Sequence, residues 1–391
     1  MGNEFLDLLE TVKAEEASVQ RVFNSSDGRG IRSMRKEDPR YLRSLAEATK
    51  LVADVTTGRA PMHRLQEAMS TSDFPLLFGD IIDRSMLGKY NEWPAVWPKF
   101  AKRGSVRDFR SKRQFVMDGA EAVLTQVPQG TEYPEAALTE NKYDYAVNKY
   151  GRRVPFLWEV FVNDDLDALR DTPNSLAKAA RMSEERFGAE LFVDSTGPDA
   201  TFFSAGNNNR ITTGGAGLSI ANLTAAMQKL WAQKDADGNP IYTGPVRLVV
   251  PPALAVTALN IVNATEIRAA AGGGAATGND AITATNWVGG YVTEVVINPW
   301  IPVIDVSANV STTFYLFADP GVGRPAMEMG FLRGHETPEL FMKAPNAVRI
   351  GGGLVGAEDG SFETDGIDYK VRHVFGGGLL DPKSGLAYIG V

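Results

Sequence analysis

Few side chains in this sequence have the types and spacing that chemistry requires. The chain of 391 residues contains three histidines, His63, His335 and His373, and no cysteine. The lack of cysteine rules out disulfides, thiolate metal sites, iron–sulfur clusters and cysteine nucleophiles. His335-Glu336 begins like the zinc-protease motif H-E-x-x-H, but Glu339 occupies the place of the second histidine. We therefore predict no catalytic residue and no metal ligand.

Two glycine-rich stretches, Gly321–Ala326 and Gly351–Gly356, match the dinucleotide-binding pattern G-x-G-x-x-G/A. Turn residues follow both, so neither opens the helix whose amino terminus would hold a pyrophosphate. Asp235–Asn239 begins like a calcium-binding loop, but Pro240 replaces its glycine and Val246 replaces its final glutamate. The sequence predicts turns at all three places and no cofactor.

The composition is typical of a folded chain of two or three domains, at roughly 150 residues per domain. Hydrophobic residues make up 43% and charged residues 23%, and the formal net charge is −8. Such a charge gives no strong overall attraction to nucleic acid or anionic lipid. The amino terminus lacks the basic and apolar regions of a signal peptide, and prolines interrupt the longest uncharged run, residues 248–265. We expect a soluble chain made in a cytosol, with no membrane partner.

Charge is distributed unevenly between two neighbouring blocks. Residues 99–113 hold seven bases and one acid, whereas residues 116–147 hold six acids and one base. The second block has little that would form a core, and it predicts a long two-stranded excursion. The bases could contact nucleic acid, pair within the chain, pair with acids of another subunit or remain solvated, since an exposed pair contributes only about 0–1 kcal/mol.

Helical and strand patterns alternate along the chain without a strict βαβ rhythm, which indicates an α+β fold. Helices are predicted over residues 71–90, 172–193 and 218–234 and in the charged segment 1–70, and strands over 146–164, 246–250, 291–297, 312–318, 348–351 and 368–375. Pro251-Pro252 predicts the start of a further helix, and residues 269–278 predict a loop.

The order of these parts resembles the Hong Kong 97-type major capsid protein of tailed bacteriophages, in its Mu-like branch. The stretches that carry the resemblance are Ser72–Gly79, Leu87–Tyr90, Val106–Phe109, Val127–Tyr133, Asn148–Arg152 through Val162–Asp165, Arg247–Leu254, and Asn286–Val288 through Asn298–Trp300. Their order is more specific than any one of them.

The resemblance implies an α+β capsid fold with a peripheral domain, an axial domain, an extended loop and an amino-terminal arm. The implied divisions are 1–70, helical arm; 71–115, lead-in helix and strand of the peripheral domain; 116–147, extended loop; 148–215, peripheral domain with the spine helix 172–193; 216–310, axial domain; and 311–391, return to both domains.

The resemblance also implies a structural protein without catalytic activity, which forms hexamers and pentamers of an icosahedral phage head. Its implied partners are copies of itself, scaffold, portal and cement proteins, and packaged double-stranded DNA bound non-specifically. Its place is the virion, assembled in the cytoplasm of a bacterial host. The residues predicted at the subunit interface are Arg107, Arg110, Lys112, Arg113, Glu132, Glu135 and Glu140.

Two alternatives stay open. An encapsulin-like compartment would share the fold and enclose cargo enzymes, although the long amino-terminal arm counts against it. A hydrolase or lyase using carboxylates such as Glu336 and Asp365 is the other alternative, and the sequence suggests no substrate for it.

Overall fold

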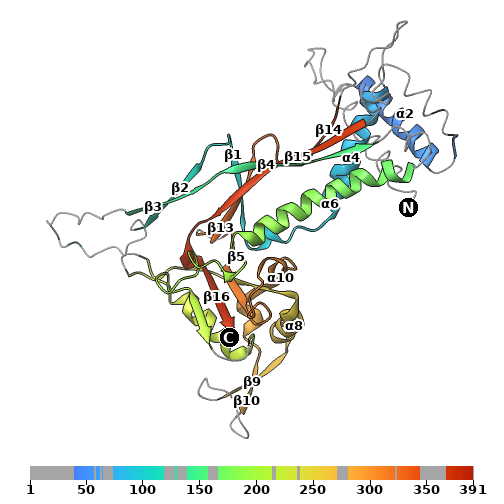
Figure 1. Cartoon of the computed structure of the whole chain (residues 1–391). Helices are drawn as coiled ribbons and strands as arrows, with labels where there is room; N and C mark the ends of the chain where they lie inside the picture. The colour runs from blue at the N-terminus through green and yellow to red at the C-terminus, as the bar shows by residue number, and fades with distance from the viewer. Residues whose placement is uncertain are drawn as a thin grey trace. The chain divides into compact units, whose positions relative to one another are not determined.

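The computed structural model describes most of the chain after residue 38 (Figure 1). The described residues are 39–56, 59–61, 64, 74–118, 127, 129, 139–156, 166–213, 217–235, 238–270, 281–321, 324–343 and 367–390. The chain divides into two compact units. The first unit comprises residues 1–94, 149–181 and 337–373, and the second comprises residues 95–148, 182–336 and 374–391.

The first unit packs helices against a small group of strands. Its elements are α2 (Pro39–Thr56), α4 (Phe74–Glu92), the first part of α6 (Leu166–Glu190), most of β4 (Val147–Phe156), β14 (Glu339–Met342) and the first half of β15 (Ile367–Leu379). Met86 and Tyr90, one turn apart on α4, are buried with Leu176 and Ala180 of α6 and Val371 of β15. This spacing places one apolar stripe of each helix on the core.

A five-stranded mixed sheet forms the centre of the second unit. Its strand order is β11 (Val292–Ile297), β8 (Val246–Val250), β12 (Phe314–Ala318), β16 (Gly385–Gly390) and β7 (Arg210–Thr213). β8 runs parallel to β11 and antiparallel to β12, and β16 runs antiparallel to β12 and parallel to β7. All residues of β12 and β16 are buried, as expected for strands covered on both faces.

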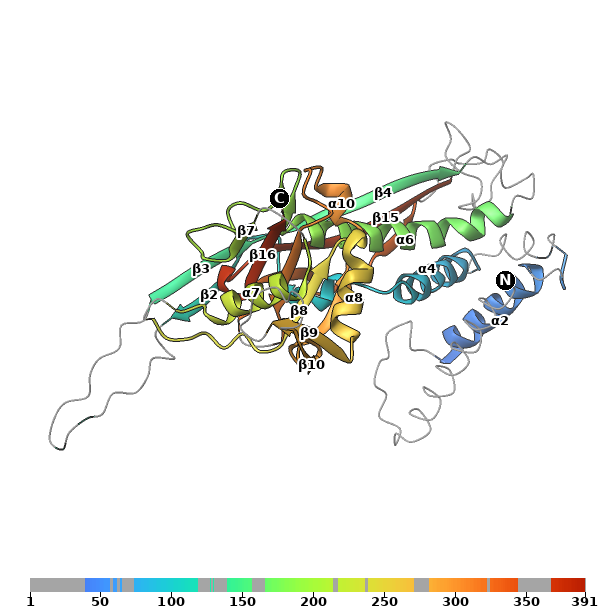
Figure 2. The ribbon, with the colours of Figure 1, turned by 90° about the horizontal axis from the view of Figure 1, so that it is seen from below.

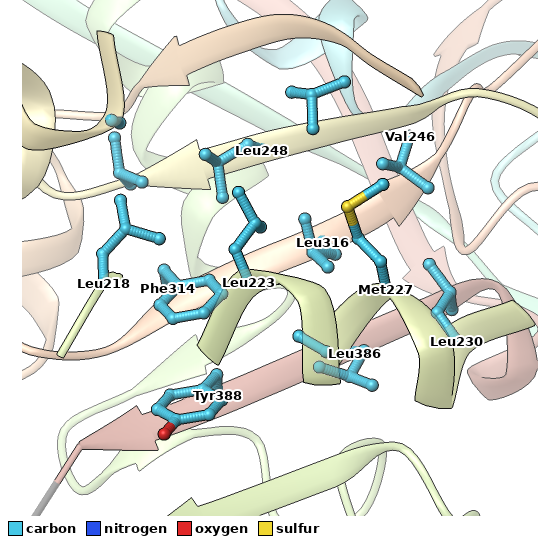
Figure 3. Close-up of a cluster of buried hydrophobic side chains, with 14 of the residues drawn as sticks. Leu218, Leu223, Met227, Leu230, Val246, Leu248, Phe314, Leu316, Leu386 and Tyr388 are labelled. Carbon is cyan, nitrogen blue, oxygen red and sulfur yellow. The ribbon is translucent and has the colours of Figure 1, made fainter. Parts of the chain in front are cut away.

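Helix α7 (Ile220–Trp231) covers one face of this sheet. Ser219 caps its amino terminus by accepting a hydrogen bond from the backbone N–H of Asn222. Leu223, Met227 and Leu230 form the buried stripe of the helix. They point toward alternate residues of the strands, among them Val246, Leu248, Phe314, Leu316, Leu386 and Tyr388 (Figure 3). The helices α8 (Ala255–Asn263; labelled in Figure 2) and α9 (Val288–Tyr291) pack on β11 in the same unit.

The other face of the same sheet carries aromatic side chains. Tyr315 and Phe317 of β12 lie opposite to Phe314 and Leu316, because side chains alternate along a strand. Their rings pack against Phe192, with centroids 4.9 Å and 5.2 Å from its ring. The sheet is therefore the middle of three layers.

The second unit also contains short strands and turns that connect its layers. These are η2 (Trp97–Lys99), β1 (Lys102–Val106), β2 (Lys112–Asp118), β3 (Thr139–Tyr145), β5 (Val193–Asp194), β6 (Gly197–Pro198), η3 (Pro252–Leu254), β9 (Glu266–Ala270), β10 (Ala281–Thr285), α10 (Ile301–Ile304), β13 (Met327–Leu332) and η6 (Pro382–Ser384). β1 runs parallel to β13, which pairs antiparallel with the second half of β15. β9 and β10 form a separate two-stranded ribbon.

The α+β class predicted from the sequence is confirmed. The strand over 246–250 has the predicted bounds, and the strands over 291–297, 312–318 and 368–375 differ from β11, β12 and β15 only at their ends. The predicted helix 218–234 is α7, shorter at both ends, and the predicted helix 71–90 is α4. β4 covers the first part of the predicted strand 146–164. The segment 348–351 and most of 1–70 lie outside the described residues.

Three predicted boundaries are wrong. The helix expected over 172–193 begins at Leu166, so Pro173 lies inside it rather than in its first turn. A proline removes one hydrogen bond and strains the turn before it, at a cost of about 3 kcal/mol, and a helix of this length tolerates that cost. After Pro251 the chain forms η3, and α8 starts only at Ala255. Ala269 and Ala270, expected in a loop, end β9.

Among the described residues, no helix combines the length and apolar character needed to cross a membrane.

Removing side-chain volume at the centre of this sheet should destabilise the chain. Leu316 is fully buried on β12 against α7. We expect Leu316→Ala to lower the free energy of unfolding by about 2–5 kcal/mol, because the cavity cannot close between two packed layers. The matched control is Val256→Ala on α8, where the side chain is 70% exposed and we expect a change within about 0.5 kcal/mol. Urea unfolding of the unassembled chain measures both, and equal effects would contradict the three-layer core.

Candidate subunit interface

The basic block lies at the root of a hairpin in the second unit. Arg107 and Arg110 occupy the bends between β1 and β2, and Arg113 lies on β2. All three side chains are exposed, and within the described part of the chain they form no ion pair. β2 pairs antiparallel with β3, with Arg113 opposite Asp144. The predicted two-stranded excursion is thus confirmed at its base.

Other bases of the block pair with acids outside the 116–147 segment. Lys99 Nζ lies 2.5 Å from Glu294 Oε1, and Arg103 Nη2 lies 3.5 Å from Glu336 Oε2. These pairs stay within the second unit. Two of the open alternatives therefore both apply. Some of the positive charge is neutralised inside the chain, and Lys102 and the three exposed arginines carry the rest.

Lys112 does not lie on the exposed surface with the three arginines. It belongs to a hydrogen-bonded network with Glu328 and Tyr145. Its Nζ lies 2.6 Å from Glu328 Oε1, and the Tyr145 hydroxyl donates to the same oxygen at 2.5 Å. The Glu328 side chain is only 3% exposed. Burial, together with the hydrogen bond to this carboxylate and its negative charge, raises the pKa of Tyr145 well above its usual value. The phenol therefore stays protonated and remains a donor to Glu328.

Two glycines make room for this network. Gly104 of β1 and Gly330 of β13 lie opposite each other in the strand register. A Cβ at Gly330 would come within 2.6 Å of the Tyr145 ring, and one at Gly104 would overlap the Glu328 carboxylate. Only glycine at both positions lets the ring of a β3 residue rest on β1 and β13.

Exposed aromatic rings accompany the arginines. Phe109 is 56% exposed and Phe115 is 52% exposed. Phe115 and Arg113 are two residues apart on β2, so they share a face of the strand. Phe100, which belongs to the same block of the sequence, is buried and packs on Phe192. Strand alternation from Arg113 was the signal that could have identified Phe115.

The acidic half of the predicted interface is described only at its edge. Glu140 lies on β3 opposite Met117. Glu132 and Glu135 lie outside the described residues. The structure thus places the three arginines on the exposed surface of the hairpin root, and their pairing with these acids remains a proposal.

A second charge network lies on β8. Arg247 bonds Glu294 and Asp319, each at 2.9 Å. Burial alone would raise the pKa of Asp319, but hydrogen bonds from the Gly321 N–H and from Arg247 outweigh it and lower that pKa. The Gly321 N–H that a nucleotide phosphate would need is thus already bonded to Asp319.

The remaining candidate residues of the sequence have structural roles where they are described. Asp235 accepts from the Asn239 N–H at 2.7 Å and so closes a turn, as predicted. His373 is buried, with its ring 6.0 Å from that of Tyr90. Glu336 pairs with Arg103, and Asp365 lies outside the described residues. Among the residues the structure describes, no group of three or more His, Cys, Asp or Glu residues could hold a metal ion.

Comparison with known protein families identifies the class of this chain. A family described as phage capsid protein matches residues 140–388, which is more than half of the sequence. The chain belongs to this family. It is a structural protein of a phage capsid, located in the virion, and the predicted resemblance is confirmed at the level of family and fold class. No curated protein sequence matches the chain.

Solved structures with a similar chain trace include several capsids. The capsid of the cyanophage P-SCSP1u is 13% identical with a TM-score of 0.45, and the match covers 76% of this chain and 88% of that chain. The capsid of an empty GTA particle is 14% identical with a TM-score of 0.47, covering 76% and 90%. The holo-SrpI encapsulin complex of Synechococcus elongatus PCC 7942 is 11% identical with a TM-score of 0.45, covering 74% and 85%. The Mu-like branch is tested by none of these and stays a prediction.

Removing the positive charge of Lys112 should show how much the burial of the Glu328 carboxylate destabilises the folded chain. Lys112→Met leaves the Glu328 carboxylate without its cation, and we expect a loss of about 2–3 kcal/mol in the free energy of unfolding, between the values for exposed and buried pairs. The double variant Lys112→Met/Glu328→Gln removes both charges and should recover most of that loss. Urea unfolding measures the series. A double variant as unstable as the single one would show that Lys112 acts through packing and not through charge.

Proposed function

We propose that copies of this chain form the hexamers and pentamers of an icosahedral phage head that encloses double-stranded DNA, without catalytic turnover. The match of residues 140–388 to the phage capsid family carries this proposal. Scaffold, portal and cement proteins are proposed as further partners. The net charge of −8 gives no strong overall attraction to DNA, so we expect its contact with the packaged DNA to be loose and non-specific.

The proposed division of the chain follows the resemblance. Residues 1–70 form an arm and residues 116–147 an extended loop, and both are buried by neighbouring copies rather than by a core of their own. Residues 71–115 and 148–215 form the peripheral domain and residues 216–310 form the axial domain. Residues 311–391 return to both domains. In a closed symmetric ring each copy gives and receives the same contact, so one hairpin on each subunit links the whole ring.

The exposed arginines are the proposed contact of the hairpin root. Arg107, Arg110 and Arg113 face solvent in the single chain and form no ion pair with any residue that the structure describes. We assign their partners to the acidic segment of another copy, with Glu132, Glu135 and Glu140. One exposed pair contributes about 0–1 kcal/mol, but a shell repeats the contact at every subunit. Phe109 and Phe115 add apolar area that assembly would bury.

The state of assembly tests the function itself. Electron microscopy and light scattering of the purified chain should show closed shells or isolated capsomers, and nuclease treatment of phage-derived particles should leave DNA protected inside. A solution containing only the 42.3 kDa monomer under all conditions would overturn the proposal. Shells that hold protein cargo and no DNA would instead favour a compartment of the encapsulin kind.

Charge reversal tests the interface. We expect Arg107→Glu/Arg110→Glu/Arg113→Glu to lower the yield of particles at least about tenfold, since each attractive pair becomes repulsive, while the stability of the single chain changes by less than about 1 kcal/mol. Particle yield is measured by sedimentation and stability by urea unfolding.

The matched control reverses three exposed bases of the first unit, Lys50, Lys149 and Arg152. It changes the net charge equally and should assemble. Adding Glu132→Arg/Glu135→Arg/Glu140→Arg to the first variant should restore particles, because the charges are then exchanged and not lost. A normal particle yield from Arg107→Glu/Arg110→Glu/Arg113→Glu alone would show that the interface lies elsewhere.

A further inference from the structure

An open groove with aromatic walls lies at one end of the central sheet of the second unit. Trp231 at the end of α7, Gly290 and Tyr291 of α9 and the segment 240–245 line it, and its volume is about 680 Å³. The Tyr291 ring packs edge to face on Trp231, with the ring centroids 5.1 Å apart. Tyr242 is 82% exposed and Tyr291 is 51% exposed. This aromatic groove therefore leaves large rings in contact with solvent in the single chain.

The aromatic groove is lined without charged side chains. Apart from Trp231, its lining belongs to residues 238–246 and 286–293, which contain no Asp, Glu, Lys or Arg. A small-molecule site would have several converging polar groups, but the side chains here offer only hydroxyls and the indole N–H. The centre of a contact between proteins is instead depleted of charge and enriched in tyrosine and tryptophan. The composition of the groove is that of a protein contact.

Aliphatic side chains are exposed on two helices of the same unit. Val256 and Leu259 lie about one turn apart on α8, and Val303 lies on α10. The exposed fractions of Val256 and Val303 are 70% and 59%, and Leu259 is also exposed. Residues 248–265 and 295–304, which include all three, contain no charged residue. These three side chains form an uncharged aliphatic surface.

The backbone brings α8 and α10 to the same place. α8 follows β8 and α10 follows β11, and the Asn298 N–H after β11 donates to Val250 O at the end of β8, at 3.0 Å. The two helices are neighbours in both views (Figures 1 and 2). The aliphatic surface thus begins where these two strands end.

The aromatic groove and the aliphatic surface lie at opposite ends of β8 and β11. The strands are parallel, with Val292 opposite Val246 at their start and Ile297 opposite Val250 at their end. Residues of the groove directly precede both strands, whereas the aliphatic surface follows them. At about 3.3 Å per residue, the strands separate the two by roughly 15–20 Å. The groove of one chain therefore cannot receive the aliphatic surface of the same chain.

The exposed rings are large enough to form the centre of a specific contact. A fully buried aromatic side chain removes about 150–250 Å² from water, so Tyr242 and Tyr291 together offer about 200–330 Å² at their exposed fractions. A specific contact buries about 800 Å² on each partner. The two tyrosines would supply about a third of that area as an apolar centre.

We propose that the aliphatic surface of one copy packs into the aromatic groove of the next copy, head to tail around each capsomer ring. This inference rests on the proposed function, since it requires a chain that assembles with itself. A hollow fits a protruding surface, whereas two grooves or two helix surfaces do not fill each other. A contact between two different surfaces repeats from copy to copy until a ring closes it. It adds to the contact of the exposed arginines at the hairpin root.

Added charge tests whether assembly needs each surface. Val256→Lys/Val303→Lys alters the aliphatic surface, and Tyr242→Lys alters the groove. Each should lower the yield of capsomers and particles at least about tenfold, because assembly would bury an unpaired charge. The Tm of the unassembled chain should change by less than about 3 °C, because these side chains are exposed. Sedimentation measures the yield, and Tyr242→Lys gives an independent result if the helix variant fails to fold.

The matched control is Thr201→Lys/Ala205→Lys, which adds the same charge at exposed residues outside both surfaces. It should assemble like the parent chain. Normal yields from both Val256→Lys/Val303→Lys and Tyr242→Lys would overturn the contact and leave the proposed function intact. A parent chain that remains monomeric would overturn the proposed function, and the contact with it.

Cross-linking tests the head-to-tail arrangement, and the absence of cysteine from the sequence makes introduced thiols specific. Particles of Tyr242→Cys/Val256→Cys, treated with a short bifunctional maleimide, should give a denaturing-gel ladder in multiples of 42.3 kDa that ends at five or six copies. Val256→Cys alone, Tyr242→Cys alone and the control Tyr242→Cys/Thr201→Cys should remain monomeric on the gel. Dimers from either single variant would show that like surfaces meet, and assembled particles without a ladder would contradict the proposal.

Discussion

The buried carboxylate of Glu328 determines how the β2–β3 hairpin is attached to the rest of the second unit. A charged oxygen that is almost fully removed from water needs a cation and a donor, and the chain supplies them from β2 and β3 as Lys112 and Tyr145. Both strands of the hairpin are therefore attached to β13 at their root. Gly104 and Gly330 are required because a side chain at either position would occupy the space of this network.

The central sheet of the second unit obeys a different constraint. β12 is buried on both faces, so each of its five residues must be apolar or aromatic, and the alternation decides only which layer each one meets. The α7 side is aliphatic and the opposite side is aromatic. This difference places the one phenol of β12, Tyr315, among groups that leave its hydroxyl without a protein partner.

The surface of the hairpin root carries the proposed contact between subunits. Arg107, Arg110 and Arg113 form no ion pair within the described part of the chain, and single exposed pairs are weak. Weak contacts suit a shell, since symmetry multiplies them while each one can still break and form again during assembly. The buried pair of Lys112 and Glu328 lies inside the subunit. It holds β2 against β13 and so positions the hairpin, but it does not belong to the exposed surface.

The sequence by itself determined the family, the α+β class, three of the five strands of the central sheet (β8, β11 and β12) and the place of the basic block, because these depend on local order, periodicity and composition. It did not determine that Lys112 leaves that block for Glu328, which lies far away in sequence, or that helix α6 begins before Pro173. Such outcomes depend on which distant groups share a desolvated site, and local patterns carry no information about that. For the same reason the sequence did not determine that Phe100 is a core residue and Phe115 an exposed one.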